Sequence, residues 1–315
     1  MRWLVLLVAL GCGPPPGSPG WIAPVPAAVP EAAPVDLRTA GVVVDRLSVF
    51  AFDGGHIDVE MRRDGARVIE VAYNHFAAPM VVAWQLSDLQ NLEPIEATSG
   101  VVMLPAAAAP NAQGAGVVLT TLAIIEPTQA YHRMLQLSER FGDPQARPAP
   151  YAYRLPYPTG KTFAVLQGFH GAFSHRGSNE FAVDFDCPVA TRVLAARPGI
   201  VIASNAAAQG AGTTPDFLEY TRTNFILVLH DDGTLGEYMH LAPSGVEVAP
   251  GQRVERGQEI GLSGNTGFSS TPHLHFQVMT AADDGIAARS FPIRFGVAPN
   301  RVEEPVQGRA YPAWE

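Results

Sequence analysis

The chain has 315 residues, of which 47% are apolar and 16% are charged, and its formal net charge is −9. This composition is typical of a packed globular protein, and the length suffices for two domains. Because the net charge is negative and the basic residues form no block, we expect no nucleic-acid partner. Beyond the first residues no run of about eighteen uncharged apolar residues occurs, so no further membrane span is expected.

The first twelve residues resemble an export signal. Met1 and Arg2 precede an apolar run at residues 3–10, which is too short to span a bilayer. Small residues before Cys12 resemble the bacterial lipoprotein signal, in which the cysteine is acylated. We therefore expect a lipoprotein signal over residues 1–12 and a lipid on Cys12; an ordinary secretory signal with Cys12 incidental is the alternative.

Residues 13–35 are rich in proline and glycine and fit a tether that leaves a membrane surface. A lipid on Cys12 would hold the chain to a membrane in the cell envelope, in the periplasm or at the outer membrane, with secretion as the alternative. If Cys12 carries lipid, Cys187 is the only other cysteine, so no disulfide framework is expected. We expect Cys187 to pack as a small apolar residue at a strand end.

Residues 36–145 are expected to form an all-β domain, for which the sequence suggests no role. Residues 56–62 alternate strictly between polar and apolar side chains, and Asp64-Gly65 is a hairpin signal into residues 67–73. Residues 131–141 fit a strand or a helix, and we favour a strand. Further strands are expected at 80–85, 101–104 and 117–125, and this spacing predicts a β-sandwich-like fold.

Residues 142–150 have the composition of a linker, and residues 151–300 are again β-rich. Two predicted strands, at 224–230 and 234–240, flank the hairpin signal Asp231-Asp232-Gly233. The predicted fold class is all-β throughout. The C-terminal tail, 301–315, is left unassigned, and we expect a monomer.

The run TPHLHF at residues 271–276 follows a glycine-rich stretch at 261–267. On a strand, side chains at i and i+2 point to the same face, so His273 and His275 would enter one site. Two imidazoles side by side can bind one metal ion, or one can bind the metal while the other acts on substrate. Two histidines that merely pack in a core or lie at the surface are the alternative.

Upstream residues favour a metal site. Asp184 lies within an apolar run at 181–185, where a carboxylate is costly unless it is paired or metal-bound. A hydrogen-bonded aspartate at a turn is the alternative. Histidines gather in the second half of the chain, and zinc prefers imidazole and carboxylate ligands. They stand at positions 170, 175, 230, 240, 273 and 275.

Taken in order, these motifs resemble the lysostaphin-type (LytM-like) zinc metalloendopeptidases, which hydrolyse peptide bonds in the cross-links and stems of bacterial peptidoglycan. The resemblance rests on His175 with Asp184, on YMHL at 238–241 and on PHLHF at 272–276. Similar runs at 187–201 and 248–261 extend it over roughly residues 160–282. It implies an antiparallel β catalytic domain with zinc in a groove between loops.

Position by position, the resemblance implies that His175, Asp184 and His275 bind Zn²⁺. It implies that His240 and His273 are catalytic histidines that do not bind the ion. One departure concerns spacing: eight residues separate His175 from Asp184, whereas three is the commonest number in the family. Longer spacings occur in a branch whose leading motif is similar to GAFSH at 171–175. His170 is a rival first ligand, and His175 is preferred because it lies in a Ser-His-x-Gly context.

Two histidines and one aspartate leave a fourth tetrahedral position for water, as catalytic zinc sites do. The ion would lower the pKa of that water to about 7 and polarise the scissile carbonyl. The sequence has no His-Glu-x-x-His motif and thus no glutamate base of that class. His240 and His273 would instead orient or deprotonate the water and stabilise the oxyanion.

The expected function is therefore zinc-dependent endopeptidase action on peptidoglycan peptides. A non-catalytic domain of the same fold that activates other cell-wall hydrolases is the alternative. Such regulators typically lack zinc ligands, whereas every matching position here holds the required residue type. A zinc peptidase that acts on a secreted protein is a third interpretation, because pocket loops set specificity. The sequence does not select among poly-glycine bridges, cross-links to a diamino acid and stem peptides.

Overall fold

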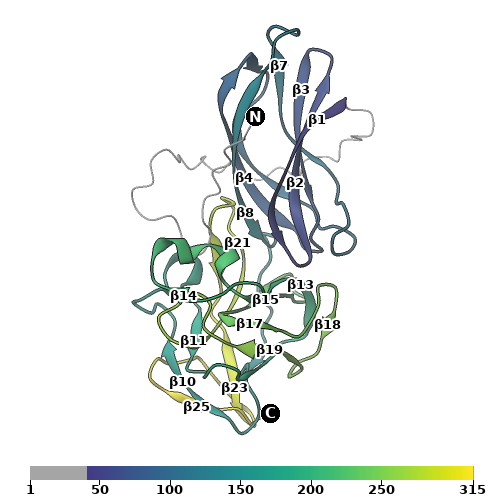
Figure 1. Ribbon diagram of the computed structural model, residues 1–315. Coiled ribbons are helices and arrows are strands. Elements are labelled where there is room, and N and C mark those ends of the chain that lie inside the picture. Colours follow the sequence, from purple (N-terminus) through teal and green to yellow (C-terminus); the bar gives the residue numbers. More distant parts are fainter. Residues whose placement is uncertain (1–40, 315) are drawn as a thin grey trace.

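The computed structural model describes residues 41–314, and its regular structure is almost entirely β, which confirms the predicted fold class. Figure 1 shows two β-rich units joined end to end. The predicted signal at 1–12, the tether at 13–35 and the start of the 36–145 domain lie outside the described residues. Within residues 41–314, no helix is long and apolar enough to cross a membrane.

The N-terminal unit is a sandwich of two antiparallel sheets. One sheet has the order β1 (Val42–Phe52), β2 (Gly55–Asp64), β3 (Arg67–Asn74), β7 (Val117–Ile124) and β5 (Leu92–Pro94). The other has the order β6 (Ser99–Leu104), β4 (Met80–Gln90) and β8 (His132–Phe141). Apolar side chains from both sheets form one buried cluster, as the predicted sandwich requires.

Three local predictions in this unit are confirmed. Ile57, Val59 and Met61, which alternate along β2, are all buried in the core between the sheets. Gly65 has a φ of 60° at the tight turn that joins β2 to β3. Glycine takes this left-handed conformation without steric cost, which is why the Asp-Gly pair signals a hairpin. The ambiguous segment at 131–141 is strand β8, which pairs along β4.

The C-terminal unit is built on one nine-stranded antiparallel sheet. The sheet order is β18 (Arg253–Val254), β13 (Gly199–Asn205), β15 (Phe225–Leu229), β16 (Leu235–Met239), β21 (Leu274–Ala281), β11 (Val183–Phe185), β10 (Thr162–Gln167) and β25 (Ala310–Pro312), with β22 (Ala288–Ser290) paired to β21. The hairpin between β15 and β16 turns at residues 231–233, as predicted. The C-terminal tail supplies β25, which pairs with β10.

Smaller sheets complete this unit. β12 (Arg192–Leu194), β19 (Glu259–Ser263) and β17 (Leu241–Val246) form one of them, and β24 (Arg301–Glu303), β23 (Arg294–Ala298) and β9 (Ala152–Arg154) form another. β14 (Ala211–Gly212) pairs in parallel with β20 (Gly267–Phe268) beside the short 3-10 turns η3 (Pro215–Leu218) and η4 (Tyr220–Arg222). Another such turn, η2 (Gly177–Asn179), precedes β11.

The two units share a hydrophobic core. The buried cluster of the sandwich continues into Phe225, Leu227, Leu235 and Met279 of the C-terminal sheet. The Phe52 and Phe225 rings meet edge to face with centroids 5.1 Å apart. Backbone hydrogen bonds also join the units, because Asp53 and Ser204 exchange N–H···O contacts of 3.1 and 3.0 Å. The interface is therefore packed like the interior of a single domain.

A substitution in this shared core should weaken both units together. We expect Phe225→Ala to lower the free energy of unfolding by about 3–5 kcal/mol, because it leaves a cavity between the units. Denaturant unfolding followed by fluorescence and by far-UV dichroism should show one coincident transition. Phe173→Ala is the control, since its side chain is 62% exposed and its removal should leave stability almost unchanged. Two separated transitions in the wild type would contradict a shared core.

Candidate metal centre

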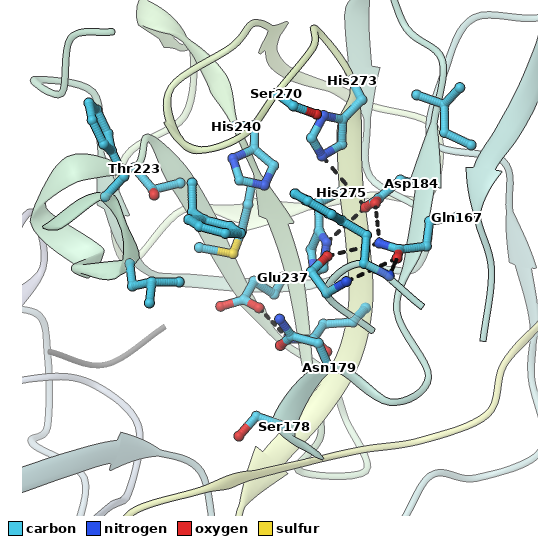
Figure 2. Close-up of a pocket in the computed structure, with 18 of the residues that line it drawn as sticks. Gln167, Ser178, Asn179, Asp184, Thr223, Glu237, His240, Ser270, His273 and His275 are labelled. Carbon is cyan, nitrogen blue, oxygen red and sulfur yellow. Dashed lines mark hydrogen bonds and ion pairs between the residues drawn. The ribbon is translucent and has the colours of Figure 1, made fainter. Parts of the chain in front are cut away.

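The nine-stranded sheet places two of the predicted site residues, Asp184 and His275, side by side on neighbouring strands. Asp184 of β11 is paired with His275 of β21, and His275 is paired on its other side with Met239 of β16. Directly opposed residues on antiparallel strands place their side chains about 5 Å apart on the same face. The sheet register therefore juxtaposes the carboxylate and the imidazole without help from loops. Figure 2 shows Asp184, His273 and His275 directed toward one another.

Three buried residues that could bind a metal ion, His175, Asp184 and His275, lie close together here. His175, which comes from the loop after β10, places Nε2 3.1 Å from Asp184 Oδ2. His275 places Nδ1 2.9 Å from Asp184 Oδ1. Each of the three residues offers one ligand atom, and these atoms lie within 4.8 Å of one another. The sequence-predicted ligand set is thus brought together.

The hydrogen bonding of His175 determines which of its ring nitrogens can bind a cation. His175 Nδ1 lies 2.8 Å from the carbonyl oxygen of Gly168, so Nδ1 carries the proton and Nε2 presents a lone pair. A lone pair that faces a carboxylate at 3.1 Å is repelled unless a proton or a cation lies between them. Nε2 of His175 and Nε2 of His275 have no hydrogen-bond partner within residues 41–314. Two imidazoles and a carboxylate are the donors that zinc prefers, and this geometry fits them.

The electrostatics of Asp184 also favour a bound cation. Burial alone would raise the pKa of this carboxyl, but contacts with His175 and His275 and the nearby His273 hold it well below its usual range. The pKa of His275 is raised because the effect of Asp184 outweighs that of burial. The Asp184 carboxyl is therefore ionised near pH 7 and can serve as an anionic ligand.

His240 and His273 lie beside the three donors, with ring centroids 4.5 Å apart. His240 Nδ1 lies 2.7 Å from Thr266 O, and His273 Nδ1 lies 2.8 Å from Thr271 O. Because a carbonyl only accepts, each ring must carry its proton on Nδ1 and keep Nε2 as a proton acceptor. Burial, with the neighbouring His273 and His275, lowers the pKa of His240 well below its usual value, so it is neutral near pH 7.

A cavity of about 370 Å³ opens in front of these side chains. Its wall includes Asp184, His240, His273 and His275. Part of its lining is apolar and includes Phe173 and Phe268, which stack with ring centroids 5.8 Å apart. The histidines thus line a space in which a peptide could bind.

Other sequence candidates lie outside the cluster. The His170 side chain is 61% exposed and its Nδ1 is 3.2 Å from Glu180 Oε1, so this rival first ligand is not among the converging donors. Cys187 is a free, fully buried cysteine in the hydrophobic core, which confirms its predicted packing role. Burial raises the pKa of its thiol.

Gln167 is a site residue that sequence reasoning missed. Its Nε2 donates to Asp184 Oδ2 at 3.0 Å, and its Oε1 accepts the backbone N–H groups of Phe173 and Ser174 at 2.8 and 3.0 Å. It therefore fixes the loop that carries His175 against the carboxylate. The available signal was a glutamine at the end of an apolar strand, immediately before the GFHGAFSH run at 168–175.

A second His/Asp group occurs in the N-terminal unit, formed by His56, Asp58 and His75. Both histidines place Nε2 3.3 Å from an Asp58 oxygen. Here the carboxylate also accepts a hydrogen bond from Ser48 and lies 3.9 Å from the Arg46 guanidinium. A fixed positive charge so near would repel a metal cation. The group at His175, Asp184 and His275 is therefore the stronger metal site.

Comparison with known proteins agrees with this geometry. Residues 178–286 match the model of peptidase family M23, and this part of the chain is a lysostaphin-type M23 peptidase domain. The match begins three residues after His175 and includes Asp184, His240, His273 and His275.

Three relatives that illustrate the similarity each match less than half of this chain. Glycyl-glycine endopeptidase ALE-1 of Staphylococcus capitis is 40% identical over 33% of this chain and 25% of its own length. Peptidoglycan DD-endopeptidase ShyA of Vibrio cholerae is 29% identical over 39% of this chain and 26% of its own length. The solved catalytic domain of lysostaphin from Staphylococcus simulans is 32% identical over 45% of this chain and 86% of that domain, with a TM-score of 0.28. The chain thus matches about a quarter of the length of these curated relatives.

Substitutions should separate metal binding from catalysis. We expect His275→Ala to lose both zinc and activity. His240→Ala and His273→Ala should each keep about one zinc per chain, while the rate falls roughly 10²–10⁴-fold, the usual effect of losing an acid–base or oxyanion group. Elemental analysis, melting temperature and turnover should be measured on each variant.

His240 requires an additional control because its φ is 62°. Asparagine tolerates this left-handed backbone better than alanine, so His240→Asn separates loss of the imidazole from backbone strain. A variant that loses stability but keeps its turnover per folded molecule would identify a packing histidine. Zinc loss in His240→Ala, with zinc retained in His175→Ala, would show a different ligand set.

Proposed function

We propose that this protein is a zinc-dependent endopeptidase that hydrolyses peptide bonds in the cross-links or stems of bacterial peptidoglycan. The M23 domain supports the peptidase class. The convergence of His175, Asp184 and His275 beside two further histidines is the observation that carries the proposal. Relatives described as a glycyl-glycine endopeptidase and a peptidoglycan DD-endopeptidase support the substrate class.

The three donors would hold the ion with little rearrangement. Gly168 O fixes the His175 ring, and Gln167 holds one oxygen of Asp184. Such outer contacts orient metal ligands and raise their basicity. Zinc held there would activate water as a nucleophile and polarise the scissile carbonyl.

His240 and His273 supply the proton transfers in this proposal. Each keeps Nε2 as an acceptor because its Nδ1 donates to a backbone carbonyl. His240 would accept a proton from the attacking water at Nε2, and His273, when it also carries a proton on Nε2, would donate to the oxygen on which negative charge develops. Burial keeps the pKa of His240 low, so this ring is neutral and able to accept.

The alternative, a non-catalytic activator of other cell-wall hydrolases, would not require a complete site. Here the donor set is complete and the two additional histidines are held in defined tautomers. These features favour an enzyme over an activator.

Digestion of purified sacculi tests the proposed activity. The zinc-loaded protein should release peptide fragments with new amino termini, and mass spectrometry of the products should identify the bond that is cut. A chelator should stop the release, and added zinc should restore it. Asp184→Asn is the matched inactive control, because it removes the charge and keeps the shape. Hydrolysis that survives complete metal removal would contradict the zinc mechanism.

We also propose that the protein is anchored in the cell envelope by a lipid on Cys12. The support is the sequence: a short apolar run, Gly11-Cys12 and a proline-rich tether. The expressed protein should sediment with membranes and incorporate labelled fatty acid, and Cys12→Ser should abolish both. Cys187→Ala is the control, because Cys187 is buried in the core and its loss should leave labelling intact. An unlabelled, unanchored wild type would refute the anchor.

A further inference from the structure

The cavity in front of the histidines continues along β21 toward the N-terminal unit. His275, Gln277 and Met279 alternate along this strand, so their side chains face the same side of the sheet, and all three line the cavity. Arg140 of β8 also lines it. Figure 2 shows Glu237 and Asn179 near each other, below His275 in the view. The N-terminal unit therefore contributes a charged side chain to the wall of the candidate active site.

Arg140 differs from the buried arginines Arg133 and Arg197 in its partners. Arg133 is paired with Glu70 at 2.7 and 3.2 Å, and Arg197 is paired with Asp232 at 2.6 Å. The Arg140 guanidinium instead donates from Nη1 to the carbonyl of Glu139 at 3.1 Å. No carboxylate within residues 41–314 forms an ion pair with it at 4.0 Å or less.

A buried charge without an ion-paired carboxylate is unfavourable, so this arrangement needs a reason. Burial lowers the pKa of Arg140, although arginine stays protonated at any physiological pH. Glu237, a carboxylate of the cavity wall, already accepts hydrogen bonds from Tyr220 Oη and from Gln277 Nε2. The guanidinium thus faces the cavity with donors to spare.

The cavity wall also contains a hydrogen-bond acceptor that has no partner. Gln277 Oε1 is buried and has no hydrogen-bond partner in the described part of the chain. An unsatisfied buried acceptor costs free energy unless a ligand supplies a donor, and a peptide N–H would do so. Arg140 and Gln277 thus add a cation and an amide acceptor to the cavity that the histidines and the Phe173–Phe268 stack also line, and a peptide in this cavity could engage them.

We propose that Arg140 binds a carboxylate of the substrate peptide and fixes the direction in which the peptide lies across the catalytic histidines. The planar guanidinium presents five donors in a fork that matches a carboxylate, and such charge-assisted pairs are strong in a buried site. This proposal rests on the proposed function and narrows it to acidic peptides. It also gives the N-terminal sandwich a role as part of the substrate site.

A pair of matched substrates tests the proposal. A purified cross-linked peptidoglycan peptide is prepared with its free carboxylates intact or converted to carboxamides. Binding of both forms to full-length, zinc-loaded His273→Ala is measured by calorimetry, and kcat/KM is measured with the wild type. We expect the amide form to bind, and to be cleaved, about 10–100-fold less well, as the loss of one charge-assisted hydrogen-bonded pair implies.

Arg140→Met should abolish this preference, and Arg140→Lys should retain part of it, because lysine keeps the charge but not the fork. Arg63→Met replaces a half-buried arginine of the N-terminal unit, whose guanidinium donates to backbone carbonyls and which does not line the cavity, and it should leave the ratio unchanged. Zinc content and melting temperature identify variants that fail to fold. If Arg140→Met fails to fold, the acid-to-amide ratios of the wild type and of Arg140→Lys test the proposal.

Equal affinity for the acid and amide forms in the wild type would overturn the proposal while leaving the endopeptidase function intact. An Arg140→Met protein that keeps the wild-type preference would also overturn it and would assign Arg140 a purely structural role between the units. A wild type that neither binds nor cleaves either peptide would overturn the proposed function together with this inference.

Discussion

The site depends on one buried carboxylate. Asp184 lies in the middle of a three-residue strand between two apolar neighbours, where an isolated negative charge would not be tolerated. It is stabilised by the Gln167 amide on one side and by the imidazoles of His175 and His275 on the other. Each of these partners comes from a different segment, so the charge can be satisfied only when the strands and the loop are all in place. The candidate metal centre therefore forms only when these segments of the domain are folded together.

Backbone carbonyls contribute as much to the site as the side chains that define it. Gly168, Thr266 and Thr271 each accept the Nδ1 proton of a different histidine, and so determine which nitrogen faces the cavity. The glycine-rich run before β21 places Thr266 where it can reach His240, and Gly267 takes a φ of 80° there. A side chain at Gly267 would collide with Thr223, so this close approach requires glycine.

The sequence was sufficient for the fold class and for the residues that now lie together. Alternation along β2, the Asp-Gly hairpin and the i, i+2 spacing of His273 and His275 are local patterns, and local patterns can be recognised without knowing the fold. Gln167 and Arg140 could not be found this way. The role of Gln167 depends on its contact with Asp184, and that of Arg140 depends on the lack of an ion-paired carboxylate, and neither can be read from neighbouring residues in the sequence. The C-terminal tail was unassigned for the same reason: β25 is short and becomes a strand only by pairing with β10.

The shared core between the two units limits how this protein can be divided. A chain that began near residue 151 would leave Phe225, Leu227 and Met279 without the sandwich that covers them. Exposed apolar patches of this kind promote self-association, so the catalytic sheet is not an independent module that can be moved to another protein unchanged. Recombination or truncation at the linker would have to be accompanied by new polar residues on that face. The boundary that is most visible in the sequence is thus a poor place to cut the molecule.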